Sequence, residues 1–279
     1  MNPARSPHPH IALALAVLAL LYAFLAGLRT VGDFDLGWQL ATGRYLVEHR
    51  RIPSGDVFSY TARDREWIYP PLSGLLFFLA HWLGGYAALS WMAAAASSAT
   101  TALLLGAGSR AAGAALAVLA VPAIAFRTAP RADLFSTVLF AALLSLLWRH
   151  HLGQKVRLWL LPLLMAAWVN LHLGFVAGLA LLVAYVALEA LDFPFGERAA
   201  AARGRLRRAA PWLGAAAAAT LVNPWGPRIY LALARQSQVQ KFHDRFVGEW
   251  SSVRVSAAVL PDALAWRDPG SAFWWLLVA

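Results

Sequence analysis

Two carboxylates, Asp33 and Asp35, follow the first long apolar run of the chain and are separated by a single residue. The run, Ile11–Leu28, contains no charged residue, and as a helix it is long enough to cross a bilayer core of about 30 Å. The two acids therefore lie at the membrane surface, where a charge has to be solvated, capped or functional. We expect one acid to be functional and the other to cap a helix. Asp35 is favoured for function because it directly precedes the next predicted helix.

Further polar residues fall on the same side of the predicted membrane as these two acids. They are Arg127, Arg131, Asp133, Asn170, His172, Arg228, Asp244, Arg245 and Glu249. A protein that only anchors something in the membrane does not need so many charged and hydrogen-bonding groups on one side. A site at the bilayer surface for a charged, lipid-linked molecule does need them, so we treat these residues as candidates for binding.

Each of these candidates also has a purely structural interpretation. Arg127 and Arg131 suit anchors at the membrane interface, and Asp133 suits an ion-pair partner of Arg131 or a helix N-cap. Asn170 and His172 suit side chains that satisfy backbone groups at a helix end. The sequence leaves both interpretations open for this group.

The composition is that of a membrane protein. Of the 279 residues, 60% are hydrophobic and only 14% are charged, whereas soluble globular domains carry about 25% charged residues. Cysteine is absent, which excludes disulfides and thiolate metal sites. The net charge of +10 is distributed over short loops between apolar segments rather than over a basic face with exposed aromatics, so we expect no nucleic-acid partner.

The apolar segments predict an all-α, polytopic transmembrane bundle with about seven spans. These spans are Ile11–Leu28, Tyr86–Leu105, Ala111–Phe126, Ala132–Trp148, Leu158–Trp168, Leu173–Leu191 and Pro211–Val222. The apolar stretch Ser271–Ala279 is too short to cross a bilayer, so we expect a truncated chain with an incomplete eighth span. The short stretch Leu72–Leu83, between two prolines and two glycines, predicts a re-entrant or interfacial helix.

The basic residues predict the orientation of this bundle. Those on one side are Arg5, Arg110, Arg149, Lys155, Arg157, Arg198, Arg203, Arg205, Arg207 and Arg208. The positive-inside rule makes these short loops cytoplasmic, together with the N-terminus. Residues 31–85 and 223–271 then form two extracytoplasmic loops of a single membrane domain, residues 1–279. We interpret the Ala/Arg-rich stretch 199–208 as a loop, and we expect no metal site at the His150-His151 doublet because it lacks metal-ligand spacing.

The first outer loop begins with an amphipathic pattern directly after the two acids. Leu36, Leu40 and Val47 fall on one helical face, and Trp38 and Tyr45 fall on another. Tryptophan and tyrosine are typical of the membrane interface. An acid at the start of such a helix accepts backbone N–H bonds and meets the positive end of the helix dipole. The pattern therefore predicts an interfacial helix.

The same loop carries an ordered series of motifs after its acids: Leu40–Leu46, then Ile52-Pro53, Asp56–Tyr60 and Trp67–Leu72. This order resembles the C-type glycosyltransferase superfamily, polytopic enzymes that use polyprenyl-phosphate sugars. Within that superfamily it looks like the protein mannosyltransferase and aminoarabinose transferase branch. The chain is also similar to a group of uncharacterised bacterial membrane proteins, which share the segments Asn170–Phe175, Asn223–Gly226 and Glu249-Trp250. Many of that group have a His-Glu-Trp-like segment where this chain reads Tyr69-Pro70-Pro71, so a second acid is missing here.

The resemblance implies an inverting transfer of a sugar from a polyprenyl-phosphate donor to a glycan, lipid or protein acceptor. The reaction would take place at the extracytoplasmic face of the bacterial inner membrane, as part of cell-envelope chemistry. Asp33 or Asp35 would act as general base on the acceptor hydroxyl, or help to hold a divalent cation such as Mg²⁺ or Mn²⁺. Arg127, Arg131 or Arg228 would stabilise the leaving lipid phosphate.

Two other functions are compatible with the sequence. A lipid-linked glycan transporter or flippase would carry polar residues through its mid-span positions, whereas Asp133 and His172 lie near the ends of predicted spans. An inactive relative is the other alternative, because the acid near Tyr69 is missing. We favour an enzyme at the membrane surface.

Overall fold

The computed structural model describes residues 9–33, 35–60, 63, 65–106, 111–125 and 129–235, and this part of the chain is mostly helical. It contains an isolated antiparallel bridge between Gly55 and Glu66 and no longer strand. The all-α prediction is therefore confirmed for the described residues. The helices are α1 (Pro9–Gly27), α2 (Asp35–His49), α3 (Pro71–Leu105), α4 (Ala111–Ala125), α5 (Asp133–His151), α6 (Leu160–Leu171), α7 (Phe175–Ala190) and α8 (Gly196–Ala219), followed by the short 3-10 helix η1 (Gly226–Arg228).

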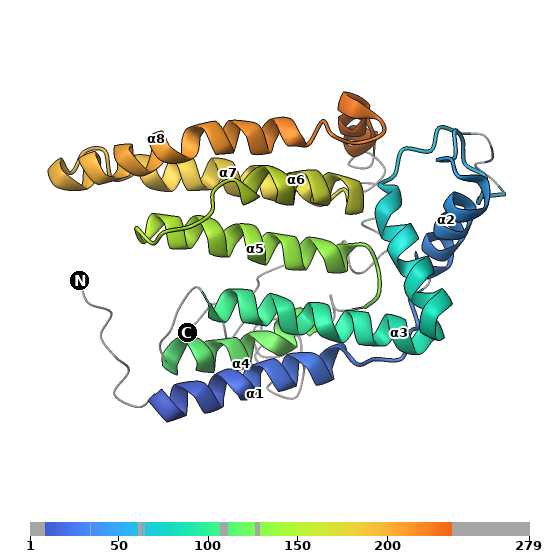
Figure 1. Cartoon of the computed structure of the whole chain (residues 1–279), viewed down its shortest axis with the longest axis horizontal. Coiled ribbons are helices and arrows are strands. Elements are labelled where there is room, and N and C mark those ends of the chain that lie inside the picture. Colours follow the sequence, from blue (N-terminus) through green and yellow to red (C-terminus); the bar gives the residue numbers. More distant parts are fainter. Residues whose placement is uncertain are drawn as a thin grey trace, which may run out of the picture.

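Most of these helices lie side by side in one layered bundle (Figure 1). α1 packs against α3 and α4, α3 packs against α5, and α8 packs against α6 and α7. The larger hydrophobic core lies among α5 to α8 and contains the fully buried side chains of Trp168, Phe175 and Met165. A smaller core around Leu36 and Phe77 joins α2 to α3 at one end of the bundle.

Three helices in the described part are long and apolar enough to cross a membrane: α1 (over His10–Gly27), α3 and α5. α6 and α7 are apolar but have only 12 and 16 residues. Each of the seven predicted spans overlaps a helix, but seven membrane spans are not confirmed. The stretch Ser271–Ala279 and most of the predicted loop 223–271 lie outside the described residues.

α3 consists of two helical segments joined at Gly84 and Gly85, whose backbone dihedrals are not helical. Gly85 has a φ of 62°, a conformation that glycine adopts without steric cost. The segment before this kink runs in a different direction from the rest of α3 (Figure 1). The predicted separate helix Leu72–Leu83 is thus present, and the residues after the kink correspond to the predicted span Tyr86–Leu105.

α2 packs on the first segment of α3 through a close approach of the two backbones. A Cβ atom at Gly43 would collide with the Gly74 carbonyl, and one at Gly74 would lie 2.8 Å from the Gln39 carbonyl. Leu36 and Gln39 are buried on this face, whereas Val47 is 46% exposed. The contact between α2 and α3 is therefore centred on the two glycines, and Val47 of the predicted apolar face lies outside it.

α8 corrects the interpretation of residues 199–208 as a loop. These residues belong to one helix of 24 residues. Alanine and arginine are both strong helix formers, so a run of them favours a helix even where it is highly charged. The buried alanines Ala199, Ala202, Ala209 and Ala216 recur at helical spacing and face the bundle. Most of the arginines therefore mark the exposed side of a helix.

In the described part of the loop between α2 and α3, the side chain of Asp56 is buried. Asp56 Oδ1 accepts the backbone N–H groups of Phe58 and Ser59, each at 2.9 Å. The Asp56 N–H donates to the Arg65 carbonyl at 2.6 Å. Burial alone would raise the pKa of this carboxyl, but the hydrogen bonds from the Ser59 side chain and the two N–H groups hold it below its usual value.

Gly43→Ala should loosen the packing of α2 on α3, because the added methyl group has no room beside Gly74. The matched control is Gly37→Ala on the same helix, where an added Cβ meets nothing within 4 Å. We expect a lower unfolding temperature and faster proteolysis of the first outer loop for Gly43→Ala only. Equal behaviour of the two variants would show that the glycine contact does not hold α2 in place.

Asp56 should make the stability of the protein depend on pH in the acidic range. Its folded-state pKa is depressed, so its contribution is complete above the unfolded value of about 4 and is lost as the pH falls through the folded value. Asp56→Asn should cost about 1–2 kcal/mol at pH 7. The difference between variant and parent should shrink as the pH falls below 4, as measured by thermal unfolding. A difference that stays constant over this range would contradict the assignment.

Candidate functional site

Three carboxylates surround one arginine at the end of the bundle where α2 and α5 begin (Figure 1). Arg131 Nε lies 3.5 Å from Asp33 Oδ2 and 3.6 Å from Asp133 Oδ1, and Arg131 Nη2 lies 3.5 Å from Asp35 Oδ2. We call these four residues the acid cluster. Arg131 and Asp35 are 96 positions apart in the sequence. The fold thus brings together four residues that were proposed separately from the sequence.

The local chemistry of helix ends explains why three acids are tolerated here. Asp33 Oδ1 accepts the backbone N–H of Asp35 at 2.9 Å and so satisfies a donor at the start of α2. Asp35 and Asp133 lie in the first turns of α2 and α5, where the positive ends of the helix dipoles stabilise negative charge. Together with Arg131, these two helix ends offset the repulsion among the three carboxylates.

Asp35 is the acid best placed to act on a bound molecule. Its side chain is 55% exposed, whereas those of Asp33 and Asp133 are 16% exposed. Its Oδ1 accepts the indole N–H of Trp38 at 3.4 Å, and its Oδ2 faces Arg131. A carboxylate that is held on two sides and open on a third can accept a proton from a hydroxyl group. Asp33, in contrast, is engaged in holding the start of α2.

The carboxylates of the acid cluster do not form a metal site built from three protein ligands. Among the residues that the structure describes, no three His, Cys, Asp or Glu side chains are grouped closely enough to hold a metal ion. The Arg131 guanidinium approaches all three carboxylates, which is the role that a metal cation would play. The expected Mg²⁺ or Mn²⁺ at Asp33 and Asp35 stays a prediction, because such a cation can be held by two carboxylates together with a substrate phosphate. No metal enters the function proposed below.

Tyr69 lies beside the acid cluster and was considered in the sequence only as the position of a missing acid. Its ring packs edge-on against Trp38, with ring centroids 4.6 Å apart, and its hydroxyl group bonds to the buried Gln39 side chain. Burial is the main cause that raises the pKa of this hydroxyl, and the negative charges of Asp35 and Asp133 raise it further. The hydroxyl therefore stays protonated near the three acids.

A mostly apolar groove of about 450 Å³ begins at Asp133 and runs along α5. Its α5 residues, from Asp133 to Leu144, recur at helical spacing and follow one face of the helix for about 16 Å. Thr100 and Leu104 of α3 and Trp168 of α6 form part of the opposite wall. The groove therefore connects the acid cluster with an apolar path through the bundle.

His172 contacts the wall of this groove through Ser136, which lies one helical turn from Asp133. The Trp168 indole N–H donates to Ser136 Oγ at 2.7 Å, and Ser136 Oγ lies 2.7 Å from His172 Nδ1. A Cβ atom at position 174 would lie 2.5 Å from Ser136 Oγ, so Gly174 leaves room for this contact. His172 is thus held near the acid cluster, and its partner Ser136 was not identified from the sequence.

Asn170 contributes to the structure rather than to the acid cluster. Its Nδ2 donates to the backbone carbonyls of Ala166 and Val222, at 2.8 and 2.7 Å, and so ties the end of α6 to the segment after α8. These contacts agree with the structural interpretation of this residue. Two other candidates, Arg127 and Glu249, lie outside the described residues, as do Asp244 and Arg245.

Arg228 is engaged with the first outer loop. It forms an ion pair with Glu66, and Arg235 contacts the same carboxylate at 2.8 Å. These contacts join the segment at η1 to the loop that precedes α3. The described contacts of Arg228 therefore do not include the acid cluster, and its predicted role at a leaving phosphate gains no support from them.

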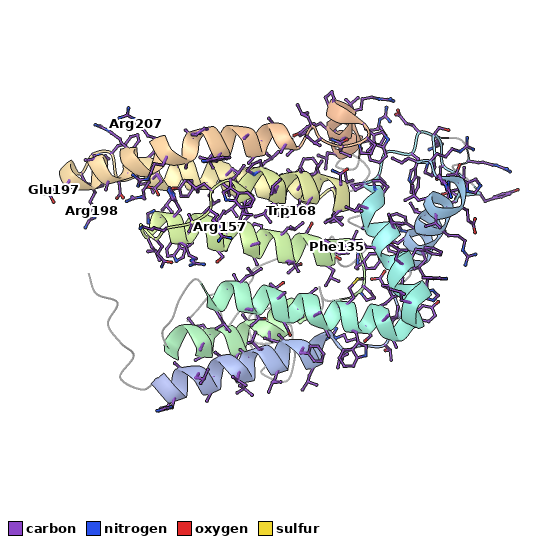
Figure 2. The ribbon with its side chains drawn as sticks, viewed as in Figure 1. Phe135, Arg157, Trp168, Glu197, Arg198 and Arg207 are labelled. Atoms are coloured by element: carbon purple, nitrogen blue, oxygen red, sulfur yellow. The ribbon has the colours of Figure 1, made fainter. Side chains whose placement is uncertain are left out.

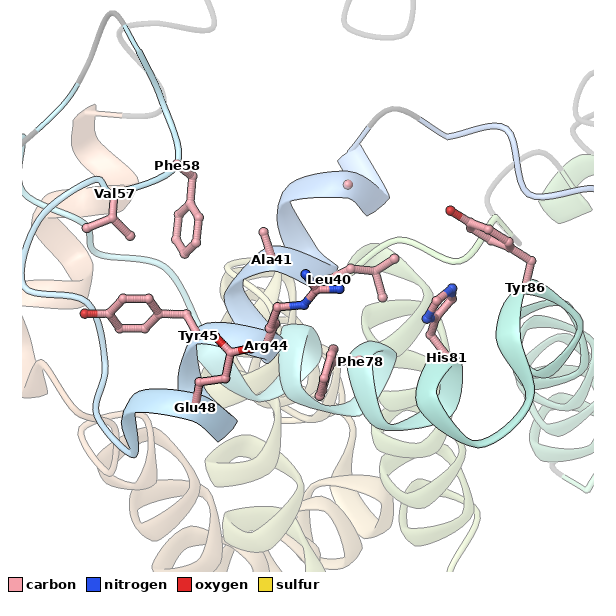
Figure 3. Close-up of a pocket in the computed structure, with 11 residues that line it drawn as sticks. Leu40, Ala41, Arg44, Tyr45, Glu48, Val57, Phe58, Phe78, His81 and Tyr86 are labelled. Carbon is pink, nitrogen blue, oxygen red and sulfur yellow. The ribbon is translucent and has the colours of Figure 1, made fainter.

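A second hollow, of about 580 Å³, lies along α2 (Figure 3). Tyr45 and Phe58 line it together with the charged side chains of Arg44 and Glu48. Helical spacing puts the α2 residues of this hollow on the side of the helix away from Asp35. The hollow is therefore separate from the acid cluster, although both use α2.

A buried polar network lies at the opposite end of the bundle, where α5 and α7 end. The fully buried Glu189 contacts Arg205 Nη2 at 2.7 Å and His151 Nδ1 at 3.0 Å, and the Tyr185 hydroxyl lies 2.6 Å from His150 Nδ1. We call these five residues the Glu189 network. Both histidines of the His150-His151 doublet, to which the sequence assigned no role, take part in this network.

Arg131→Gln should destabilise the protein, because it leaves three carboxylates close together without their shared counter-charge. We expect a loss of about 1–3 kcal/mol, measured as a lower unfolding temperature in detergent. Adding Asp133→Asn to the variant should restore part of the loss. The control is Arg29→Gln, whose side chain donates only to the Ala26 carbonyl in the described contacts. Equal losses for the two arginine variants would contradict a special role of the acid cluster in stability.

No model of a known protein family matches this chain, and neither does a curated protein or a solved structure. The resemblance to C-type glycosyltransferases that the sequence motifs indicate therefore stays a prediction. A function for the chain has to be argued from the acid cluster, the groove that begins there and the apolar helices that surround both.

Proposed function

We propose that the chain is a membrane glycosyltransferase that takes a sugar from a polyprenyl-phosphate donor at the extracytoplasmic face of the bacterial inner membrane. The observation that supports it best is the connection between the acid cluster and the apolar groove along α5. A polyprenyl-phosphate sugar has a matching layout, with a long apolar tail, a phosphate group and a polar sugar. The groove suits the tail, and the acid cluster lies where the polar head would be.

The proposal includes the finer topology that the sequence predicts. The apolar segments that are shorter than α1, α3 and α5 complete a bundle of seven spans, and the N-terminus is cytoplasmic. The helix ends at the acid cluster then face the extracytoplasmic side, with α2 at the membrane interface. Exposed apolar side chains on α1, such as Leu13 and Leu25 at 65% each, suit contact with lipid.

In the proposed reaction Asp35 accepts the proton of the acceptor hydroxyl. The acceptor oxygen forms a bond to the anomeric carbon, and the bond from that carbon to the phosphate oxygen breaks with inversion. The lipid phosphate leaves with the electron pair. The Arg131 guanidinium stabilises the negative charge of this leaving phosphate. When the phosphate takes up part of the Arg131 guanidinium, that group holds the Asp35 carboxylate less firmly.

A transporter of lipid-linked glycans is the competing function. Such a protein needs polar groups along a path through the middle of the bundle. Among the described residues of the groove, the charged side chain is Asp133 at the start of α5, and the residues farther along are apolar or carry hydroxyl groups. This distribution favours a reaction at the membrane surface over movement of a charged head group across the bundle.

Asp35→Asn should lower the rate of sugar transfer by about 100-fold or more, because the amide cannot accept the proton. The assay follows loss of labelled sugar from a polyprenyl-phosphate donor with the full-length protein in proteoliposomes. Asp33→Asn should have a smaller effect, since Asp33 mainly holds the start of α2. The matched control is Glu197→Gln at the far tip of α8 (Figure 2), which should leave the rate unchanged.

Two results would contradict the proposal. Full activity of Asp35→Asn would exclude this residue as the base. Movement of intact labelled donor across the vesicle membrane, without cleavage of the sugar, would favour the transporter.

A further inference from the structure

A hollow of about 310 Å³ lies at the end of the bundle opposite to the acid cluster, between the loop that follows α5 and the charged half of α8. His150, Lys155 and Arg208 line it, together with Gln154. Arg208 reaches it because residues 199–208 are helical. One turn earlier on the same face of α8, Arg205 holds the Glu189 network.

The two cations of this hollow have no carboxylate partner among the described residues. The nearby acids Glu189 and Asp192 are both held by Arg205, at 2.7 and 3.5 Å. None of the described lining residues of the hollow is acidic. Lys155 and Arg208 are exposed and both line the hollow, so an anion bound there would be attracted by two positive charges.

His150 forms the buried part of the hollow. It is only 5% exposed, and its Nδ1 lies 2.6 Å from the Tyr185 hydroxyl, which leaves Nε2 as the ring nitrogen for a ligand. The rest of the Glu189 network fixes this arrangement, because Glu189 is fully buried and bound by Arg205 and His151. Because the Tyr185 hydroxyl holds its Nδ1, His150 offers a positioned hydrogen-bonding group to an anion.

The surroundings of the hollow indicate that it lies at a membrane surface. Trp148, Leu152 and Trp159 flank the loop that lines it, and they are 42%, 51% and 46% exposed. Exposed tryptophans at the ends of apolar helices are typical of the level of the lipid headgroups. The anion available at that level is the phosphate of a phospholipid.

We propose that this hollow binds a phosphate group, with Lys155 and Arg208 as its counter-charges and His150 as a hydrogen-bonding partner at its base. The headgroup of an anionic phospholipid is the favoured source, because basic pockets at the ends of membrane helices bind such headgroups. A soluble phosphate compound would present the same chemistry. This site is independent of the proposed glycosyltransferase function, since it lies at the other end of the bundle.

The test compares two double variants that lose the same charge. Lys155→Gln with Arg208→Gln removes both cations of the hollow. Arg157→Gln with Arg207→Gln removes two nearby exposed cations that do not line it, and Arg207 projects from the outer side of α8 (Figure 2). Each full-length protein is placed in nanodiscs of phosphatidylcholine. Binding of added phosphatidylglycerol is measured by native mass spectrometry, and binding of inorganic phosphate by calorimetry.

We expect the variant that lacks Lys155 and Arg208 to bind phosphatidylglycerol about 30-fold more weakly, because it loses two cations that attract the anionic headgroup. The control variant should bind like the parent. A selective loss of inorganic phosphate binding alone would support the site with a soluble ligand. Equal losses in both variants, or no binding of either probe by the parent, would overturn the proposal. Circular dichroism of both variants checks that the helices are retained.

Discussion

Charge is expensive inside a bundle of apolar helices, and among the described residues the acid cluster and the Glu189 network lie toward opposite ends of the bundle. At one end, helix N-termini and the Arg131 guanidinium stabilise the three carboxylates of the acid cluster. At the other end Arg205 neutralises Glu189 where α7 finishes. This constraint follows from the low polarity of the helix surfaces, because an unpaired charge away from a helix end or a partner would be costly. The two polar regions of the molecule are therefore fixed by the same physical requirement.

The two ends meet this requirement in different ways. The Glu189 network is closed, since its central carboxylate is fully buried and bound on several sides. The acid cluster is open, because Asp35 is more than half exposed and the groove begins at Asp133. A closed network holds helices together, whereas an open one keeps groups accessible to a ligand. This difference is the reason to look for chemistry at the acid cluster and for a structural role, with a surface hollow beside it, at the Glu189 network.

The helices of the described part follow from local sequence, but the partners of their side chains do not. Apolar runs predicted helices that overlap α1, α3 to α7 and the second half of α8, and an amphipathic pattern predicted α2. Two adjacent glycines marked the break in α3, because these signals act within a few residues. Tyr69 and Ser136 were missed as neighbours of the site, since their contacts join distant segments. The 199–208 stretch was misread because its charge was weighed above the helix propensity of alanine and arginine. The four residues of the acid cluster were all named from the sequence, although their geometry required the packing of α2, α3 and α5.

The charge balance of the acid cluster limits what it can bind. Three carboxylates outnumber the one guanidinium that contacts them all, so a phosphate group approaching the cluster is repelled unless it gains part of Arg131. Any bond from Arg131 to a phosphate competes with its bonds to the acids, all of which are 3.5 Å or longer. Such long contacts are weaker than close ion pairs and can be exchanged at modest cost. Binding of an anionic head group and release of the Asp35 carboxylate are therefore coupled through one side chain.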